Sequence, residues 1–312
     1  MPSSFYRVTG PRERAEMVPG AKKQAGADSR PFLVTEKITE IRERIAAART
    51  GPEIVVSLVP TMGFFHEGHL SLMHAARAES DLVVVSIFVN PAQFRPEEDL
   101  DAYPRDLQRD LDLAAREGVD LVFSPAEDEM YPKGFDTCIE VGEVADGLCG
   151  QGRPGHFRGV ATVVAKLFNI VRPDKAYFGQ KDAQQVAVIK KMAVELNMNM
   201  EVIALPTVRE SDGLAMSSRN TYLDEEQRQA ATILYQSLQL AQSLWVKGER
   251  NVGVIRHEMT EFIEKEPLAN LEYISIAEAG TLKELHNIKP PALVSLAVKI
   301  GKTRLIDNIV LE

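Results

Sequence analysis

Residues 59–90 read VPTMGFFHEGHLSLMHAARAESDLVVVSIFVN, and this stretch decides the fold. A mostly apolar run at residues 54–59 leads into it and is typical of a buried parallel strand. After a glycine-containing turn, apolar residues recur at helical spacing over residues 70–76, and a second apolar run covers residues 82–89. Strand, turn, helix and strand in this order predict a right-handed βαβ unit, with a polar loop at the C-terminal end of the first strand.

Two histidines occupy the point where the predicted helix begins. His66 and His69 are three residues apart, so both imidazoles lie on one helix face and can reach one ligand. The free N–H groups and partial positive charge of a helix N-terminus favour a phosphate there, and Gly63 and Gly68 allow it to approach the backbone. The alternative is a turn that carries two surface histidines. A zinc-protease motif is excluded because Leu70 stands where its second histidine belongs.

Composition and charge limit the classes of partner. The chain has 312 residues, enough for two domains, and its hydrophobic content of 45% is ordinary for a globular protein. A net charge of −9 argues against nucleic acid as a partner but leaves small anionic substrates open. The sequence contains no apolar run of membrane-spanning length and no signal-peptide pattern, and its two cysteines, Cys138 and Cys149, suggest a reducing compartment. We therefore expect a cytoplasmic protein that does not span a membrane.

Polar side chains follow two of the predicted strands. Asn90 and Gln93 come after the strand at residues 82–89, and Lys181 and Asp182 come after a short strand at residues 176–178. Open α/β sheets bind ligands just beyond the C-terminal ends of their strands. There, amides suit a carboxylate or hydroxyl group, and a lysine neutralises phosphate. Taken singly, each residue has an ordinary alternative as a turn cap or a solvated surface group.

Two later loops are rich in small and polar residues. Residues 150–155 spell GxGxxG, but no buried strand precedes them and a proline interrupts them, so they do not predict a dinucleotide site. We interpret them as a flexible loop that carries Arg153, His156 and Arg158 toward a nucleotide. Residues 216–219, Met-Ser-Ser-Arg, offer hydroxyl groups, backbone N–H groups and one cation, which suit phosphate. The alternative for them is a serine-rich helix entry.

The order of predicted elements divides the chain into three parts. Residues 1–30 mix proline, glycine, serine and charged residues and are expected to form a disordered or loosely attached extension. Residues 31–207 alternate strands with helices, which predicts an α/β domain with a Rossmann-like, doubly wound parallel sheet. Residues 208–312 are predicted to form a smaller α+β domain, with a long helix over residues 224–245, a second helix and three β-rich segments.

Several blocks together resemble one enzyme family. The His66-Glu67-Gly68-His69 block resembles the HxGH signature of the nucleotidyltransferase superfamily, and residues 216–219 resemble its second, KMSKS-type signature. Four stretches are similar to the pantothenate synthetase family in particular: Pro-Thr-Met-Gly at 60–63, Asn-Pro-x-Gln-Phe at 90–94, Arg-Pro-x-His-Phe-x-Gly at 153–159 and Phe-Gly-x-Lys-Asp-x-Gln-Gln at 178–185. The resemblance covers about residues 33–312.

The resemblance implies a ligase reaction in two steps. The carboxylate of pantoate attacks the α-phosphorus of Mg-ATP and gives pantoyl adenylate and pyrophosphate. The amine of β-alanine then displaces AMP and gives pantothenate. The resemblance also implies a homodimer. Two alternatives stay open: another adenylyl-transferring enzyme of the superfamily that keeps AMP in its product, and a nucleotide-binding sensor without catalytic activity.

Residue roles follow from the same resemblance. His66, His69 and Lys181 are expected to act in catalysis, and Asn90, Gln93 and Gln185 are expected to bind pantoate or β-alanine. Mg²⁺ is expected to accompany ATP, and Asp110, chosen for its place in the helix predicted after Tyr103 and not from the resemblance, is the candidate for helping to hold it. The expected ATP contacts are Met62, Gly63, Phe64, Phe65, His66, Glu67, Gly68, His69, Gly179, Gln180, Lys181, Asp182, Val208, Met216, Ser217, Ser218 and Arg219.

Overall fold

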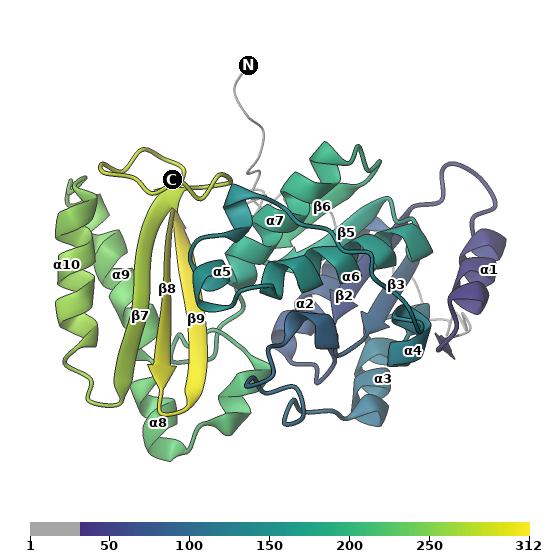
Figure 1. Cartoon of the computed structure of the whole chain (residues 1–312), viewed down its shortest axis with the longest axis horizontal. Helices are drawn as coiled ribbons and strands as arrows, with labels where there is room; N and C mark the ends of the chain where they lie inside the picture. The colour runs from purple at the N-terminus through teal and green to yellow at the C-terminus, as the bar shows by residue number, and fades with distance from the viewer. Residues whose placement is uncertain (1–31) are drawn as a thin grey trace, which may run out of the picture.

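The chain folds into two regions, each built on its own β-sheet (Figure 1). The structure is a computed structural model that describes residues 32–312, so the extension expected at residues 1–30 lies outside the described residues. One region holds a six-stranded parallel sheet, and the other holds a three-stranded antiparallel sheet close to the C-terminus. The predicted fold class is confirmed.

The parallel sheet has the strand order of a doubly wound fold. Its order is β1-β4-β3-β2-β5-β6, so the chain first builds outward from β2 and later returns to the other side of β2. The direction of winding reverses between β2 and β5, and such a switch point is where open α/β sheets bind ligands. The strands are β1 (Leu33–Thr35), β2 (Val56–Thr61), β3 (Leu82–Ile87), β4 (Leu121–Phe123), β5 (Lys175–Gly179) and β6 (Glu201–Leu205).

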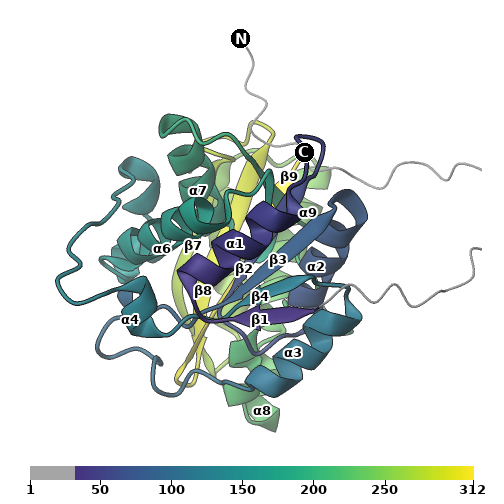
Figure 2. The same cartoon turned by 90° about the vertical axis from the view of Figure 1, so that its right-hand side faces the viewer.

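Helices cover both faces of this sheet because successive side chains of a strand point to opposite faces (Figure 2). Leu58 and Val84 belong to the core that contains α1 (Ile38–Ala48), α6 (His156–Val171) and α7 (Ala183–Glu195). Their neighbours Val59 and Val85 belong to the core on the other face, together with residues of α2 and α3. Those two helices span Glu67–Glu79 and Leu107–Arg116. The apolar runs of the sequence are therefore strands that are buried on both faces.

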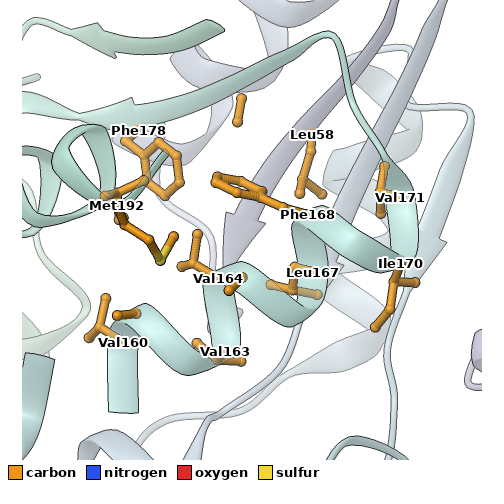
Figure 3. Close-up of a cluster of buried hydrophobic side chains, with 14 of the residues drawn as sticks. Leu58, Val160, Val163, Val164, Leu167, Phe168, Ile170, Val171, Phe178 and Met192 are labelled. Atoms are coloured by element: carbon orange, nitrogen blue, oxygen red, sulfur yellow. The ribbon is translucent and has the colours of Figure 1, made fainter. Parts of the chain in front are cut away.

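Helix α6 is buried on nearly all sides, which explains its almost continuous apolar sequence. Figure 3 shows its side chains in the cluster that also contains Leu58 of β2, Phe178 of β5 and Met192 of α7. The ring of Phe168 meets the ring of Phe178 from β5 edge-to-face, with 6.4 Å between the ring centroids. Both rings are about 95% buried. The start of this helix therefore stands in a fixed position beside the C-terminal ends of the strands.

The C-terminal region packs two long helices against its antiparallel sheet, and its core is separate from the two cores of the parallel sheet. Its helices are α8 (Glu225–Ala230), α9 (Ile233–Val246) and α10 (Val252–Ile263), and its strands are β7 (Ala269–Glu278), β8 (Ala292–Ile300) and β9 (Thr303–Leu311). The single helix predicted over residues 224–245 is wrong. The chain tightens at Thr232, whose N–H and hydroxyl group both donate to the carbonyl oxygen of Gln229, and this interrupts the helical ladder.

Short helical turns connect the longer elements. They are η1 (Pro91–Gln93), α4 (Glu127–Met130), η2 (Glu143–Ala145), α5 (Cys149–Gly152), η3 (Gln180–Asp182) and η4 (Ser218–Tyr222). Among residues 32–312, none of the helices is both long and apolar enough to cross a membrane. The separate cores agree with a boundary near residue 207, although the predicted limits of the domains stay predictions.

Candidate active site

A cleft lies beyond the C-terminal ends of β2 and β5, at the switch point of the parallel sheet. Loops that follow four strands meet there, together with the start of α6. The cleft gathers fifteen of the residues expected from the sequence: Met62, His66, Gly68, His69, Asn90, Gln93, Gly179, Lys181, Asp182, Gln185, Val208, Met216, Ser217, Ser218 and Arg219. Segments more than 150 residues apart in the sequence thus share one site.

Six expected residues do not line this cleft: Gly63, Phe64, Phe65, Glu67, Gln180 and Asp110. Phe65 is fully buried in the core beneath α2, so it supports the site from behind. Gln180 turns toward the C-terminal region, where its side chain donates to Asn308 at 3.3 Å. Their expected contacts with ATP or metal have no counterpart in the lining of the cleft.

The two histidines of the signature cap the helix that they begin. Nδ1 of His66 accepts from the N–H of Gly68 at 3.1 Å, and Nδ1 of His69 accepts from the N–H of His66 at 3.3 Å. The sequence predicted free N–H groups at the N-terminus of this helix, but the N–H groups of His66 and Gly68 donate to the two rings. Because a backbone N–H only donates, both rings are neutral with the proton on Nε2. That Nε2–H is the group left to each ring for binding a ligand.

Burial and neighbouring positive charge keep these rings neutral. Burial is the largest effect and, with the charge of Lys181, lowers the pKa of His66 to about 4. Burial, His66 and Lys181 lower the pKa of His69 well below its usual value. The two ring centroids are 4.1 Å apart, so one protonated ring would repel another. At neutral pH the pair therefore offers two hydrogen-bond donors, and Lys181 supplies the positive charge.

Asp110 holds the turn in front of the histidines. Its carboxylate is 1% exposed, and its two oxygens accept from the N–H groups of Phe64 at 2.6 Å and Phe65 at 2.7 Å. Phe64 has a φ of +53°, and Gly63 before it has a φ of +82°, a region that favours glycine. A Cβ at Gly63 would also lie 2.9 Å from Asp110. Asp110 thus fixes the turn before the histidines, and its expected part in holding a metal ion stays a prediction.

Neutral amides form another part of the cleft. Gln93, Gln185 and Asn90 all line it, although Asn90 is only 1% exposed. The side chain of Asn90 accepts from the N–H of Ala92 and so caps η1. The turn-capping role that the sequence left open for Asn90 is therefore present in the structure.

The loop at residues 150–155 ends beside η1. Arg153 forms an ion pair with Glu98 and donates to the carbonyl oxygen of Gln93, which is also 2.8 Å from Nδ1 of His156. Arg153 also lies 3.0 Å from Nε2 of His156, so the ring is neutral and carries its proton on Nδ1. Burial, mainly, lowers the pKa of His156 to about 4. Arg158 points elsewhere: it pairs with Glu140 on the surface, so its expected place near a nucleotide is wrong.

The segment at residues 216–219 lines the cleft and contacts the turn that precedes α2. The hydroxyl of Ser218 donates to the carbonyl oxygen of Phe64 at 3.3 Å. Arg219 makes two hydrogen bonds to the carboxylate of Asp99, both 2.9 Å long. Burial opposes ionisation of Asp99, but the hydrogen bonds and charge of Arg219 outweigh it and lower the pKa of Asp99 below its usual value.

Two parts of the cleft wall were not expected from the sequence. The ring of Tyr103 stands 6.0 Å from Phe94 and 5.9 Å from the guanidinium of Arg219. The first turns of α6 supply an apolar wall made of Val160, Val163, Val164 and Leu167. The surplus of apolar residues on α6 was a signal for burial, but it does not distinguish burial in a core from a place beside a ligand.

Comparison with known proteins assigns the family. The family model for pantoate-beta-alanine ligase matches residues 33–310. A pantothenate synthetase from Pelotomaculum thermopropionicum is 56% identical over 280 residues, which cover 90% of this chain and 99% of the relative. A pantothenate synthetase from Roseiflexus castenholzii is 58% identical over 266 residues, which cover 85% of this chain and 96% of the relative.

Solved structures give the same result. The crystal structure of pantothenate synthetase from Thermus thermophilus aligns with a TM-score of 0.84 and 43% identity, covering 89% of this chain and 99% of that one. Pantoate-beta-alanine ligase from Francisella tularensis, complexed with beta-gamma ATP and beta-alanine, aligns with a TM-score of 0.73 and 35% identity, covering 89% and 97%. Signature blocks, cleft geometry and comparisons agree, and the chain belongs to the pantoate–beta-alanine ligase family.

Proposed function

We propose that this protein joins pantoate to β-alanine in an ATP-dependent reaction that passes through pantoyl adenylate. One observation carries the proposal: the cleft brings two neutral imidazoles and Lys181 to the same site as the uncharged amides of Gln93 and Gln185. Donors and a cation suit a phosphate whose negative charge increases in the transition state. Amides suit the hydroxyl groups and carboxylate of a small acid.

The first step needs positioning more than proton transfer. The carboxylate of pantoate attacks the α-phosphorus of ATP, the bond to the bridging oxygen breaks, and pyrophosphate leaves. In this step His66 and His69 donate from Nε2 to phosphate oxygens, and Lys181 neutralises part of their charge. In the second step the amine of β-alanine attacks the acyl carbon, and AMP leaves with one oxygen of the former carboxylate.

Magnesium belongs to the proposal as part of the Mg-ATP substrate. Within the described part of the chain, no group of three or more histidine, cysteine, aspartate or glutamate side chains is arranged to hold a metal ion. Both oxygens of Asp110 already accept backbone hydrogen bonds. The phosphate oxygens of ATP and water would supply most of the ion's ligands, as is usual for Mg²⁺ in phosphoryl-transfer sites. We also propose a cytoplasmic homodimer, as the family resemblance implies.

Product analysis with labelled pantoate tests this function. The protein is incubated with Mg-ATP, β-alanine and pantoate that carries heavy oxygen in its carboxylate, and the nucleotide is examined by mass spectrometry. We expect AMP with one labelled oxygen, formed only when pantoate and β-alanine are both present during turnover. ADP with labelled inorganic phosphate would instead show an acyl phosphate and overturn the adenylate mechanism. AMP retained in the product would show an adenylyl transferase, and binding of ATP without turnover would show a sensor.

A further inference from the structure

A row of side-chain hydrogen bonds runs from behind the cleft wall into the cleft. The hydroxyl of Tyr131 donates to Oδ1 of Asn90 at 2.7 Å, and Nδ2 of Asn90 donates to Oε1 of Gln93 at 3.0 Å. Gln93 lines the cleft, whereas Tyr131, just after α4, does not. A residue outside the cleft is thus connected through one buried amide to a residue that faces a ligand.

Backbone groups fix which way the amide of Asn90 points. The N–H of Ala92 donates to Oδ1 at 3.3 Å, and the carbonyl oxygen of Gly159 accepts from Nδ2 at 3.2 Å. Because a backbone N–H only donates and a carbonyl only accepts, the oxygen and nitrogen of this amide cannot exchange places. With Tyr131 and Gln93 included, both donors and both acceptor positions of Asn90 are occupied.

The fixed amide of Asn90 in turn fixes that of Gln93. Oε1 of Gln93 accepts from Asn90, and this orients the amide so that Nε2 lies beside Met62, which also lines the cleft, and can donate to a ligand. The partner of Nε2 is Sδ of Met62 at 3.1 Å, and a thioether sulfur is a weak acceptor. An oxygen of a bound acid substrate would be a stronger partner and would replace the sulfur.

We propose that Tyr131 and Asn90 are positioning residues, which hold Gln93 as a hydrogen-bond donor toward an oxygen of the acid substrate. This inference rests on the proposed function, in which that acid is pantoate. It also changes the role expected for Asn90: the residue acts through Gln93, because its own polar atoms are occupied and its side chain is buried. The preference of the site for an acceptor oxygen would then depend on Asn90 and Tyr131, which do not themselves contact the substrate.

The packing around the row keeps its members close together. A Cβ at Gly159 would lie 2.1 Å from the carbonyl oxygen of Ala92, so α6 touches η1 where only a glycine fits. The ring of Tyr131 is held by Phe135, at 5.2 Å between ring centroids, and by the ammonium of Lys166, at 5.8 Å from the ring. These contacts do not depend on the hydroxyl group, so Tyr131→Phe removes one hydrogen bond and leaves the ring packing in place.

The first test compares two tyrosine variants. Tyr131→Phe is expected to raise the KM for pantoate about two- to tenfold, the range for the loss of one intramolecular hydrogen bond, with an unchanged KM for ATP. Tyr177→Phe is the matched control, because the Tyr177 hydroxyl also donates a part-buried hydrogen bond to a side chain, that of Glu79 at 3.1 Å, outside the row. Its KM for pantoate should stay at the wild-type value. Equal effects in both variants would overturn the inference.

A double-mutant cycle separates positioning from general support of the fold. In a Gln93→Ala background, Tyr131→Phe should have no further effect on the KM for pantoate, because the residue that it positions is gone. If the two substitutions raise the KM for pantoate by factors that multiply in the double variant, Tyr131 acts independently of Gln93 and the proposal is contradicted. Melting temperatures of all variants are measured alongside, since a purely structural role would move them without this coupling.

The direction of the hydrogen bond between Gln93 and the substrate is tested with Gln93→Glu. This change places an oxygen where Nε2 donates, so the KM for pantoate should exceed that of Gln93→Ala. If Gln93→Glu binds pantoate as well as the wild type, Gln93 is an acceptor and the inference is wrong. The wild-type protein must first form AMP from pantoate and β-alanine. Its failure to do so refutes the proposed function, whereas an active wild type with uncoupled variants refutes only this inference.

Discussion

Residues 62–69 and residues 216–219 face the same cleft but are held by different forces. The first segment is fixed by buried contacts: Asp110 binds its turn, and the ring of His66 caps its helix. The second segment is held by the ion pair of Arg219 with Asp99, whose side chains are 28% and 24% exposed, and by the hydroxyl of Ser218, which donates to Phe64 of the first segment. One side of the cleft is therefore fixed by buried contacts alone, and the other depends in part on a contact that solvent reaches.

This difference indicates which side of the cleft can change its position more easily. Buried hydrogen bonds leave unsatisfied N–H groups when they break, so the turn before His66 is costly to move. An ion pair at the rim exchanges its partner for water at low cost. We therefore expect variants of the first segment to change the rate of the chemical step, and variants of the second to change mainly the binding of ATP.

The largest effect is expected at His69. His69→Ala removes an Nε2–H donor to the phosphate, and loss of one such donor costs about 3–4 kcal/mol in the transition state, or about a factor of 10²–10³ in kcat. The measurement is AMP formation at saturating substrates, with the melting temperature as a check of folding. His74→Ala is the control, because His74 lies on the same helix but 83% of its side chain is exposed. Near wild-type turnover in a folded His69→Ala variant would refute the role of this ring.

A smaller effect is expected at Asp110. Asp110→Asn keeps the shape of the side chain but turns one of its two acceptors into a donor, so the N–H of Phe64 or Phe65 loses its partner. We expect a loss of about 1–3 kcal/mol in the free energy of unfolding, with a fall in kcat because the histidine turn shifts. Urea denaturation measures the first quantity. Asp112→Asn is the control on the exposed side of α3 and should leave both quantities unchanged. Unchanged stability with a higher requirement for Mg²⁺ would instead support the metal role.

Residues 62–69 also show which features of the site can be predicted from the sequence. The first segment was predictable because its information is local: an apolar strand, a turn and two histidines at helical spacing lie within a few residues. The contact that fixes it was not, because Asp110 and Phe64 are 46 positions apart and no spacing rule connects them. The role of Asn90 was obscured for the same reason, since its partners Gly159 and Tyr131 come from later elements.

Short or weakly patterned elements were also missed. Strand β1 has three residues and pairs only with β4 at the edge of the sheet, so it gives no alternation to detect. The break before α9 lies at Thr232, whose N–H and hydroxyl group bond to Gln229, while the apolar pattern continues through it. Periodicity thus predicted the buried layers, and local side-chain bonding decided where they end.

The smallest effect is expected at the ion pair of the second segment. Asp99→Ala leaves Arg219 without the carboxylate that holds it. A partly exposed pair of this kind contributes about 1 kcal/mol, so we expect the KM for ATP to rise about fivefold. The KM for pantoate and the melting temperature should change little, because the pair belongs neither to the amides nor to a core. Raising the salt concentration should weaken ATP binding more in the wild type than in the variant, since ions screen the pair that the variant already lacks. Glu140→Ala removes the exposed pair with Arg158 outside the cleft and serves as the control. A large fall in kcat with an unchanged KM for ATP would show that residues 216–219 are as rigidly coupled to the chemistry as residues 62–69, and the contrast between the two segments would then be wrong.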